Sequence, residues 1–125
     1  MPFTPIPKAR PRFTRRGFAY TDKKTRDYES LVRSIAIKEY KQPISCPIEA
    51  RLTFIMPIPS SLSEKKRKEL IGKPHIKRPD TDNLIKILDS LNGVAFTDDS
   101  LIYKIIAEKR YGLEPKTIVE LIPLI

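Results

Sequence analysis

The feature that most constrains the fold of this chain is a run of nine residues with alternating side-chain character. Ile48, Ala50, Leu52, Phe54 and Met56 alternate with the residues at 49, 51, 53 and 55. A period of two over this length is typical of a β-strand with one buried face. The sequence therefore predicts a sheet whose buried face contributes to the core.

Three further segments have the spacing or the end signals of helices. Residues 23–40 carry apolar side chains at helical spacing. Ser61 and Glu64 form the pattern of a capping box, which opens a short basic helix that ends at Gly72. In residues 82–91, apolar side chains recur at i, i+3, i+4 and i+7. We therefore expect about three helices.

Turn signals near both ends of the chain indicate β-hairpins. Arg15-Arg16-Gly17 lies between short aromatic segments and favours a two-stranded ribbon. Residues 103–111 alternate, a turn follows at 112–115, and residues 117–122 suit a returning strand. With three helices and about five strands, the sequence predicts an α+β fold on a small mixed, mostly antiparallel sheet. At 125 residues we expect one domain, residues 1–125.

Charge is distributed unevenly along the chain. Twenty-four Lys and Arg against fifteen Asp and Glu give a net charge of +9, which favours a polyanionic partner. Residues 1–26 and 64–78 are strongly basic, whereas residues 80–99 hold five aspartates and one lysine. Because each carboxylate repels nucleic acid, a protein that only neutralises phosphate has no use for this acidic region. A bound metal ion removes the contradiction.

Several classes of protein are excluded by composition. No apolar run approaches the roughly 18 to 20 residues that span a bilayer, so we expect no membrane segment. The proline-rich N-terminus lacks the pattern of a secretory signal peptide. The single cysteine, Cys46, cannot form an intrachain disulfide, so a reducing, cytoplasmic location is expected.

Two acidic pairs form the candidate site for chemistry. Asp80 and Asp82 lie at the start of the third predicted helix, with Lys86 on the same polar stripe as Asp82, and Asp98-Asp99 follows in a later loop. Hard carboxylate oxygens suit Mg²⁺, which also takes water and phosphate oxygens as ligands. Two structural alternatives stay open, since Asp at a helix start is ordinary capping and Lys86 could form a salt bridge with Asp82.

The runs RPDTDNLIKILDSLNGVAFTDDSLI and PIPKARPRFTRRGFAYT resemble the RusA-type Holliday junction resolvases over nearly the whole chain. The resemblance implies a RusA-like fold, with Asp80, Asp82 and Asp99 as the metal-binding catalytic residues and Lys86 as their support. It also implies a homodimer, a phage or prophage setting and dependence on Mg²⁺, with Mn²⁺ as a substitute. Relative to the family pattern, one residue is missing between Lys86 and Asp89, so Asp89 is not carried over.

The leading hypothesis is therefore a Mg²⁺-dependent endonuclease that resolves four-way DNA junctions in recombination and repair, without an organic cofactor. The alternatives are a non-catalytic nucleic-acid-binding module and a metal-dependent nuclease for other branched or single-stranded DNA. His75, the only histidine, is expected to be solvated or to face DNA. The residues expected to bind DNA are Lys8, Arg10, Arg12, Arg15, Arg16, Lys77 and Arg78.

Overall fold

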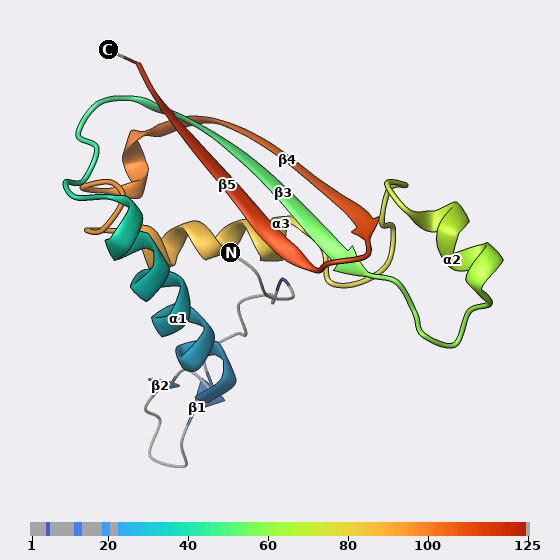
Figure 1. Ribbon diagram of the computed structural model, residues 1–125. Coiled ribbons are helices and arrows are strands. Elements are labelled where there is room, and N and C mark those ends of the chain that lie inside the picture. The colour runs from blue at the N-terminus through green and yellow to red at the C-terminus, as the bar shows by residue number, and fades with distance from the viewer. Residues whose placement is uncertain (1–4, 6–11, 14–18, 21–22, 125) are drawn as a thin grey trace.

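The computed structural model describes residues 5, 12–13, 19–20 and 23–124 of the chain (Figure 1). Its helices and strands confirm the predicted α+β class, with a mixed sheet and three α-helices. In chain order they are β1 (Arg12–Phe13), β2 (Ala19–Tyr20), α1 (Lys23–Glu39), β3 (Ile48–Pro57), α2 (Glu64–Leu70), α3 (Thr81–Ile85), the 3₁₀ helices η1 (Lys86–Leu91) and η2 (Asp99–Leu101), β4 (Ile102–Gly112) and β5 (Lys116–Pro123).

The main sheet has three strands, and β3 lies between the other two. β4 pairs with β3 in parallel, and β5 pairs with β3 in antiparallel orientation. The prediction of a C-terminal hairpin was therefore wrong, because β3 separates the two strands that the short turn connects. β3 buries every second side chain and satisfies both of its edges in this position, which a neighbouring β4–β5 pair would not achieve.

One face of the sheet carries the hydrophobic core. Ile48, Ala50, Leu52, Phe54 and Met56 are all buried, as the alternation predicted. They pack against Val32 and Ala36 of α1 and against the segment formed by α3 and η1. Figure 1 shows both helical segments on the same side of the sheet. The fold thus has two layers, and the third helical segment is held by its apolar side.

The N-terminal ribbon is the second, smaller sheet. β1 and β2 are antiparallel, with Arg12 opposite Tyr20 and Phe13 opposite Ala19. This pairing agrees with the predicted hairpin, although the turn residues Arg15, Arg16 and Gly17 lie outside the described part of the chain.

The two shorter helices differ from expectation in their ends. The N-cap of α2 is Ser63, whose hydroxyl accepts the backbone N–H of Lys66 at 3.3 Å, so the capping box at Ser61 was wrong. α3 changes at Lys86 into the tighter 3₁₀ form of η1. Its apolar residues are nevertheless buried as predicted, at Leu84, Ile87, Leu88 and Leu91. Among the described residues, no helix has both the length and the apolar character to cross a bilayer.

Candidate functional site

The site is built around an extended segment, residues 72–79, which we call the arm. The arm follows α2, and it runs beside the C-terminal half of β4. The backbone N–H of Gly72 donates to the carbonyl of Tyr111 at 2.8 Å, and that of Tyr111 donates to Lys73 at 3.0 Å. The N–H of His75 donates to the carbonyl of Lys109 at 3.0 Å. These bonds add the first half of the arm to the edge of the sheet.

A lysine side chain fixes the second half of the arm. The ammonium of Lys109, on β4, donates to the carbonyl oxygens of Lys77 and Pro79, both at 2.7 Å. Lys109 is the register partner of Phe54, so it projects from the face of the sheet that carries the core. Because Pro79 directly precedes Asp80, this contact sets the position from which the acidic motif begins.

Asp80 and Asp82 flank the first residue of α3. Asp80 is the N-cap residue in extended conformation, and its side chain makes no capping hydrogen bond. Asp82 lies in the first turn, and both residues are exposed. The capping alternative therefore does not account for Asp80, whose carboxylate remains available to a ligand.

Lys86 begins η1 and is exposed, as are Asp82 and Asp89, so the predicted polar stripe faces solvent. Within the described residues, the ion pairs join Glu49 to Arg51 and Lys104, and Glu108 to Arg110. The salt bridge that could have occupied Lys86 with Asp82 is thus not formed in the described part of the chain. Asp89 has an interaction of its own.

The two members of the distal pair have different roles in the structure. Asp98 is the N-cap of η2, and its carboxylate accepts the backbone N–H of Ser100 at 3.3 Å and also the Ser100 hydroxyl. These hydrogen bonds lower the pKa of Asp98 below its ordinary value. Asp99 is the first residue of η2 and is exposed. Asp98 therefore has a structural function as a cap, whereas Asp99 contributes to the hydrogen bonding of the Asp98 carboxylate and is exposed.

The first acidic pair and Asp99 adjoin segments that meet β4 at different positions. The arm is tied to β4 at Lys109, whereas η2 enters β4 at Ile102, seven residues earlier. At about 3.3 Å per residue, these positions are about 23 Å apart along the strand. Consistently, no three His, Cys, Asp or Glu side chains among the described residues are grouped so that they could hold a metal ion. Asp80 and Asp82 are brought together by sequence, and with Asp99 they do not form such a group in the described part of the chain.

Of the residues expected to bind DNA, two can be located with their side chains. Lys77 and Arg78 are exposed on the arm directly before the acidic pair. Arg12 lies in β1, but its side chain is not among those described. Lys8, Arg10, Arg15 and Arg16 lie outside the described residues.

His75 corrects an expectation, because it is only 9% exposed rather than solvated. Its ring packs on Tyr111 with the centroids 4.8 Å apart, and its Nδ1 atom is buried with no partner in the described part of the chain. Burial lowers the pKa of His75, and the positive charges of Lys109 and Lys77 lower it further. The arm therefore packs around a neutral imidazole.

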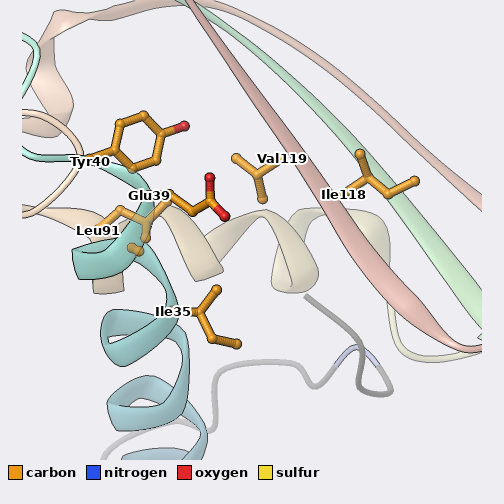
Figure 2. Close-up of a pocket in the computed structure, with 7 residues that line it drawn as sticks. Ile35, Glu39, Tyr40, Leu91, Ile118 and Val119 are labelled. Atoms are coloured by element: carbon orange, nitrogen blue, oxygen red, sulfur yellow. The ribbon is translucent and has the colours of Figure 1, made fainter.

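A separate pocket of about 220 Å³ lies between the end of α1 and β5. Figure 2 shows Ile35, Glu39 and Tyr40 facing Ile118 and Val119 across it. Burial and the neighbouring Glu39 carboxylate raise the pKa of Tyr40. The lining contains none of the aspartates of the acidic motif, so the pocket is not part of the candidate site.

Sequence reasoning missed two residues that position the site. The role of Lys109 could not be predicted from sequence, because a lysine in a basic strand gives no indication of the carbonyl groups to which it will donate. Arg33 of α1 donates to the carbonyls of Ser90 and Asn92, both at 3.2 Å, and so secures the end of η1. Both contacts join segments far apart in the chain, and only the tertiary structure reveals them.

Comparison with known proteins points in the same direction as the motif. The family model for endodeoxyribonuclease RusA matches residues 2–122. The chain is also similar to the uncharacterized protein YqaN of Bacillus subtilis (strain 168). The two are 29% identical over 121 residues, which cover 90% of this chain and 85% of the relative. The match extends over both acidic pairs and the arm.

We predict that Lys109→Met will loosen the arm. Removing the ammonium leaves the carbonyls of Lys77 and Pro79 without their donor, so the free energy of unfolding should fall by about 1–3 kcal/mol. Hydrogen exchange should also become faster at the amides of Gly72 and His75. The control is Lys38→Met, which removes the same charge from the exposed end of α1. Unchanged exchange in the arm would contradict the proposed role of Lys109.

We also predict that protonation of His75 will destabilise the protein at acidic pH. The pKa of His75 is lower in the folded than in the unfolded chain, so the unfolded chain binds the proton first. Stability is therefore complete above the unfolded pKa of about 6.5 and falls as the pH drops from there towards the folded pKa. Urea unfolding across this range should show a smaller pH dependence for His75→Gln than for the wild type. Equal pH dependence would exclude His75 as the cause.

Proposed function

Because the chain belongs to the RusA endodeoxyribonuclease family, we propose that it is a Mg²⁺-dependent endonuclease that resolves four-way DNA junctions during recombination and repair. The observation that supports a catalytic role most directly is the placement of two exposed carboxylates at the end of a fixed basic arm. Lys77 and Arg78 lie two or three residues before Asp80, so a phosphate bound by the arm lies beside the acidic pair.

Asp80 and Asp82 fit the requirements of Mg²⁺. This ion takes one or two carboxylates and completes its shell with water and phosphate oxygens, so a full protein cage is not needed. When bound, Mg²⁺ would neutralise the phosphate and lower the pKa of a water ligand. Asp80 has no capping hydrogen bond to give up, which leaves its oxygens ready for the ion. Asp99 enters the proposal through the motif alone.

The lysine and the basic residues have separate roles in the proposal. Lys86 is exposed and not paired with Asp82 in the described part of the chain, so its ammonium can stabilise charge that develops on the phosphate. Lys77, Arg78 and the arginines of the N-terminal ribbon would bind phosphates and orient the DNA.

A homodimer follows from the symmetry of the substrate. Resolving a four-way junction requires cuts in two strands related by an approximate two-fold axis, and each chain has one motif with Asp80 and Asp82. A two-fold dimer supplies two such motifs in the required relation. The exposed side chains of β4 also favour self-association, since Tyr103, Ile105 and Ile106 are 58%, 45% and 46% exposed.

We predict that Asp80→Asn removes cleavage but preserves junction binding, because a carboxamide keeps the shape of the side chain and ligates Mg²⁺ poorly. Asp82→Asn and Asp99→Asn should behave alike, and Lys86→Ala should lower the rate with little change in metal affinity. The assay is cleavage of a labelled synthetic four-way junction with and without Mg²⁺, next to duplex and single-stranded controls. Near-normal turnover in one variant would remove that residue from the site.

The homodimer can be tested by mixing subunits. Light scattering should report about twice the mass of the 14.4 kDa chain. A tagged dimer with one wild-type and one Asp80→Asn subunit should nick one strand and fail to complete resolution. Two coordinated cuts by this mixed dimer, without subunit exchange, would show that paired incision by two sites is wrong.

A further inference from the structure

The structure contains a second candidate surface for DNA, in the region of α2. This helix has no buried residues, and in Figure 1 it stands apart from the two layers that form the core. Residues 64–78, which comprise α2 and most of the arm, carry seven Lys and Arg against Glu64 and Glu69. A helix that contributes nothing to the core, in a lobe with this charge, is suited to a polyanionic partner.

A pocket of about 590 Å³ lies between α2 and the arm. This volume is within the range of small-ligand sites, which is about 300–1,000 Å³. Most of its lining is apolar, and these residues are Pro59, Leu62, Leu70, Pro74, Ile76 and Tyr111. Such a lining suits a flat, largely apolar group rather than a free ion.

The polar residues of the lining select a charged ligand. Lys73 and Lys77 both border the pocket and are exposed, so their ammonium groups lie where an attached phosphate would be neutralised. Ser61, also in the lining, can exchange hydrogen bonds with a polar edge of the ligand. A nucleotide in DNA combines these features, because its base has apolar faces and polar edges and is flanked by phosphates.

One wall of the pocket is rigid and leads directly to the acidic motif. Tyr111 is 7% exposed, and its backbone is paired with Gly72 and Lys73 of the arm. The carbonyl of Lys77 is held by Lys109, which also holds Pro79, the residue before Asp80. A nucleotide bound in the pocket would therefore lie next to the part of the DNA strand that is presented to Asp80 and Asp82.

Ile76 has an exposure that the fold does not require. Ile76 is 88% exposed. Its neighbours in the chain, His75 and Lys77, are both polar, and the arm is held by backbone hydrogen bonds, so an apolar side chain at this position is not needed for packing. Apolar side chains presented in this way by DNA-binding proteins insert between bases and unstack them. Ile76 at the rim can thus fill the space that a base leaves when it enters the pocket.

We propose that the pocket between α2 and the arm accepts one unstacked nucleobase of the DNA substrate, with Lys73 and Lys77 on the flanking phosphates. This inference rests on the proposed function and deepens it. Unstacking is least costly where pairing is already disturbed, as at the centre of a branched junction. The pocket would thereby favour branched DNA over continuous duplex.

The test uses 2-aminopurine, a base whose fluorescence rises when it is unstacked, at each position near the crossover of a four-way junction. Binding is measured with EDTA present, so that the DNA stays intact. We expect the wild type to raise the fluorescence at one or a few positions. Ser61→Phe, which fills the pocket, should abolish this rise and weaken junction binding by about tenfold. Ile76→Ala should reduce the rise.

Matched controls keep the result specific. Ser45→Phe and Ile37→Ala make the same changes at exposed positions outside the lining and should leave the rise intact. Thermal unfolding of each variant shows whether the fold is retained. The inference is overturned if the wild-type protein binds the junction without raising the 2-aminopurine fluorescence. It is also overturned if the rise in fluorescence persists with folded Ser61→Phe. If such a protein still cleaves the junction with Mg²⁺, only the pocket is wrong, whereas failure to bind or cleave junctions overturns the proposed function as well.

Discussion

The double contact of Lys109 is the interaction on which the geometry of the site depends. One ammonium group on β4 holds the carbonyls of Lys77 and Pro79, and thereby places the last residues of the arm and the first residue of the acidic motif. β4 is in turn fixed by ten register pairs with β3, the strand that carries the core. The position of Asp80 is thus determined by the packing of the sheet, although Asp80 itself is exposed and contributes no packing.

The arm also explains why a buried histidine is found in a strongly basic segment. His75 lies near the positive charges of Lys109 and Lys77, and a third positive charge there would be costly. The imidazole ring packs on Tyr111, which forms part of the pocket lining. Neutral His75 therefore connects the packing of the arm to the shape of the pocket beneath α2.

Local patterns in the sequence predicted most of the elements but not their arrangement. The alternation of Ile48 to Met56 identified β3 and its buried face, because burial and strand period are properties of the segment itself. The order β4-β3-β5 was not predictable in this way, since a short turn between strands favours direct pairing and the insertion of β3 is a long-range choice. The change to 3₁₀ form at Lys86 was missed for a related reason, as it leaves the apolar spacing intact.

The candidate site shows the same division. The motif identified Asp80, Asp82 and Lys86, and the structure adds that these side chains are exposed. Sequence could not show that Asp98 is used as a cap or that β4 begins at Ile102, seven residues before Lys109, because both depend on how η2 joins the sheet.

The juxtaposition of basic arm and acidic pair has an electrostatic consequence for the order of binding. Lys77 and Arg78 lie within a few residues of Asp80, a separation comparable with the roughly 8–10 Å over which charges at physiological salt still interact. In the proposed function, the arm would attract a phosphate that the two carboxylates repel, and the balance at the scissile position would stay unfavourable without a bound cation. In the proposed function, a divalent cation would reverse that balance at this one position and leave the rest of the basic surface unchanged. DNA bound without metal would thus be held by the arm and α2. The acidic pair would contact the phosphate only when the cation is present.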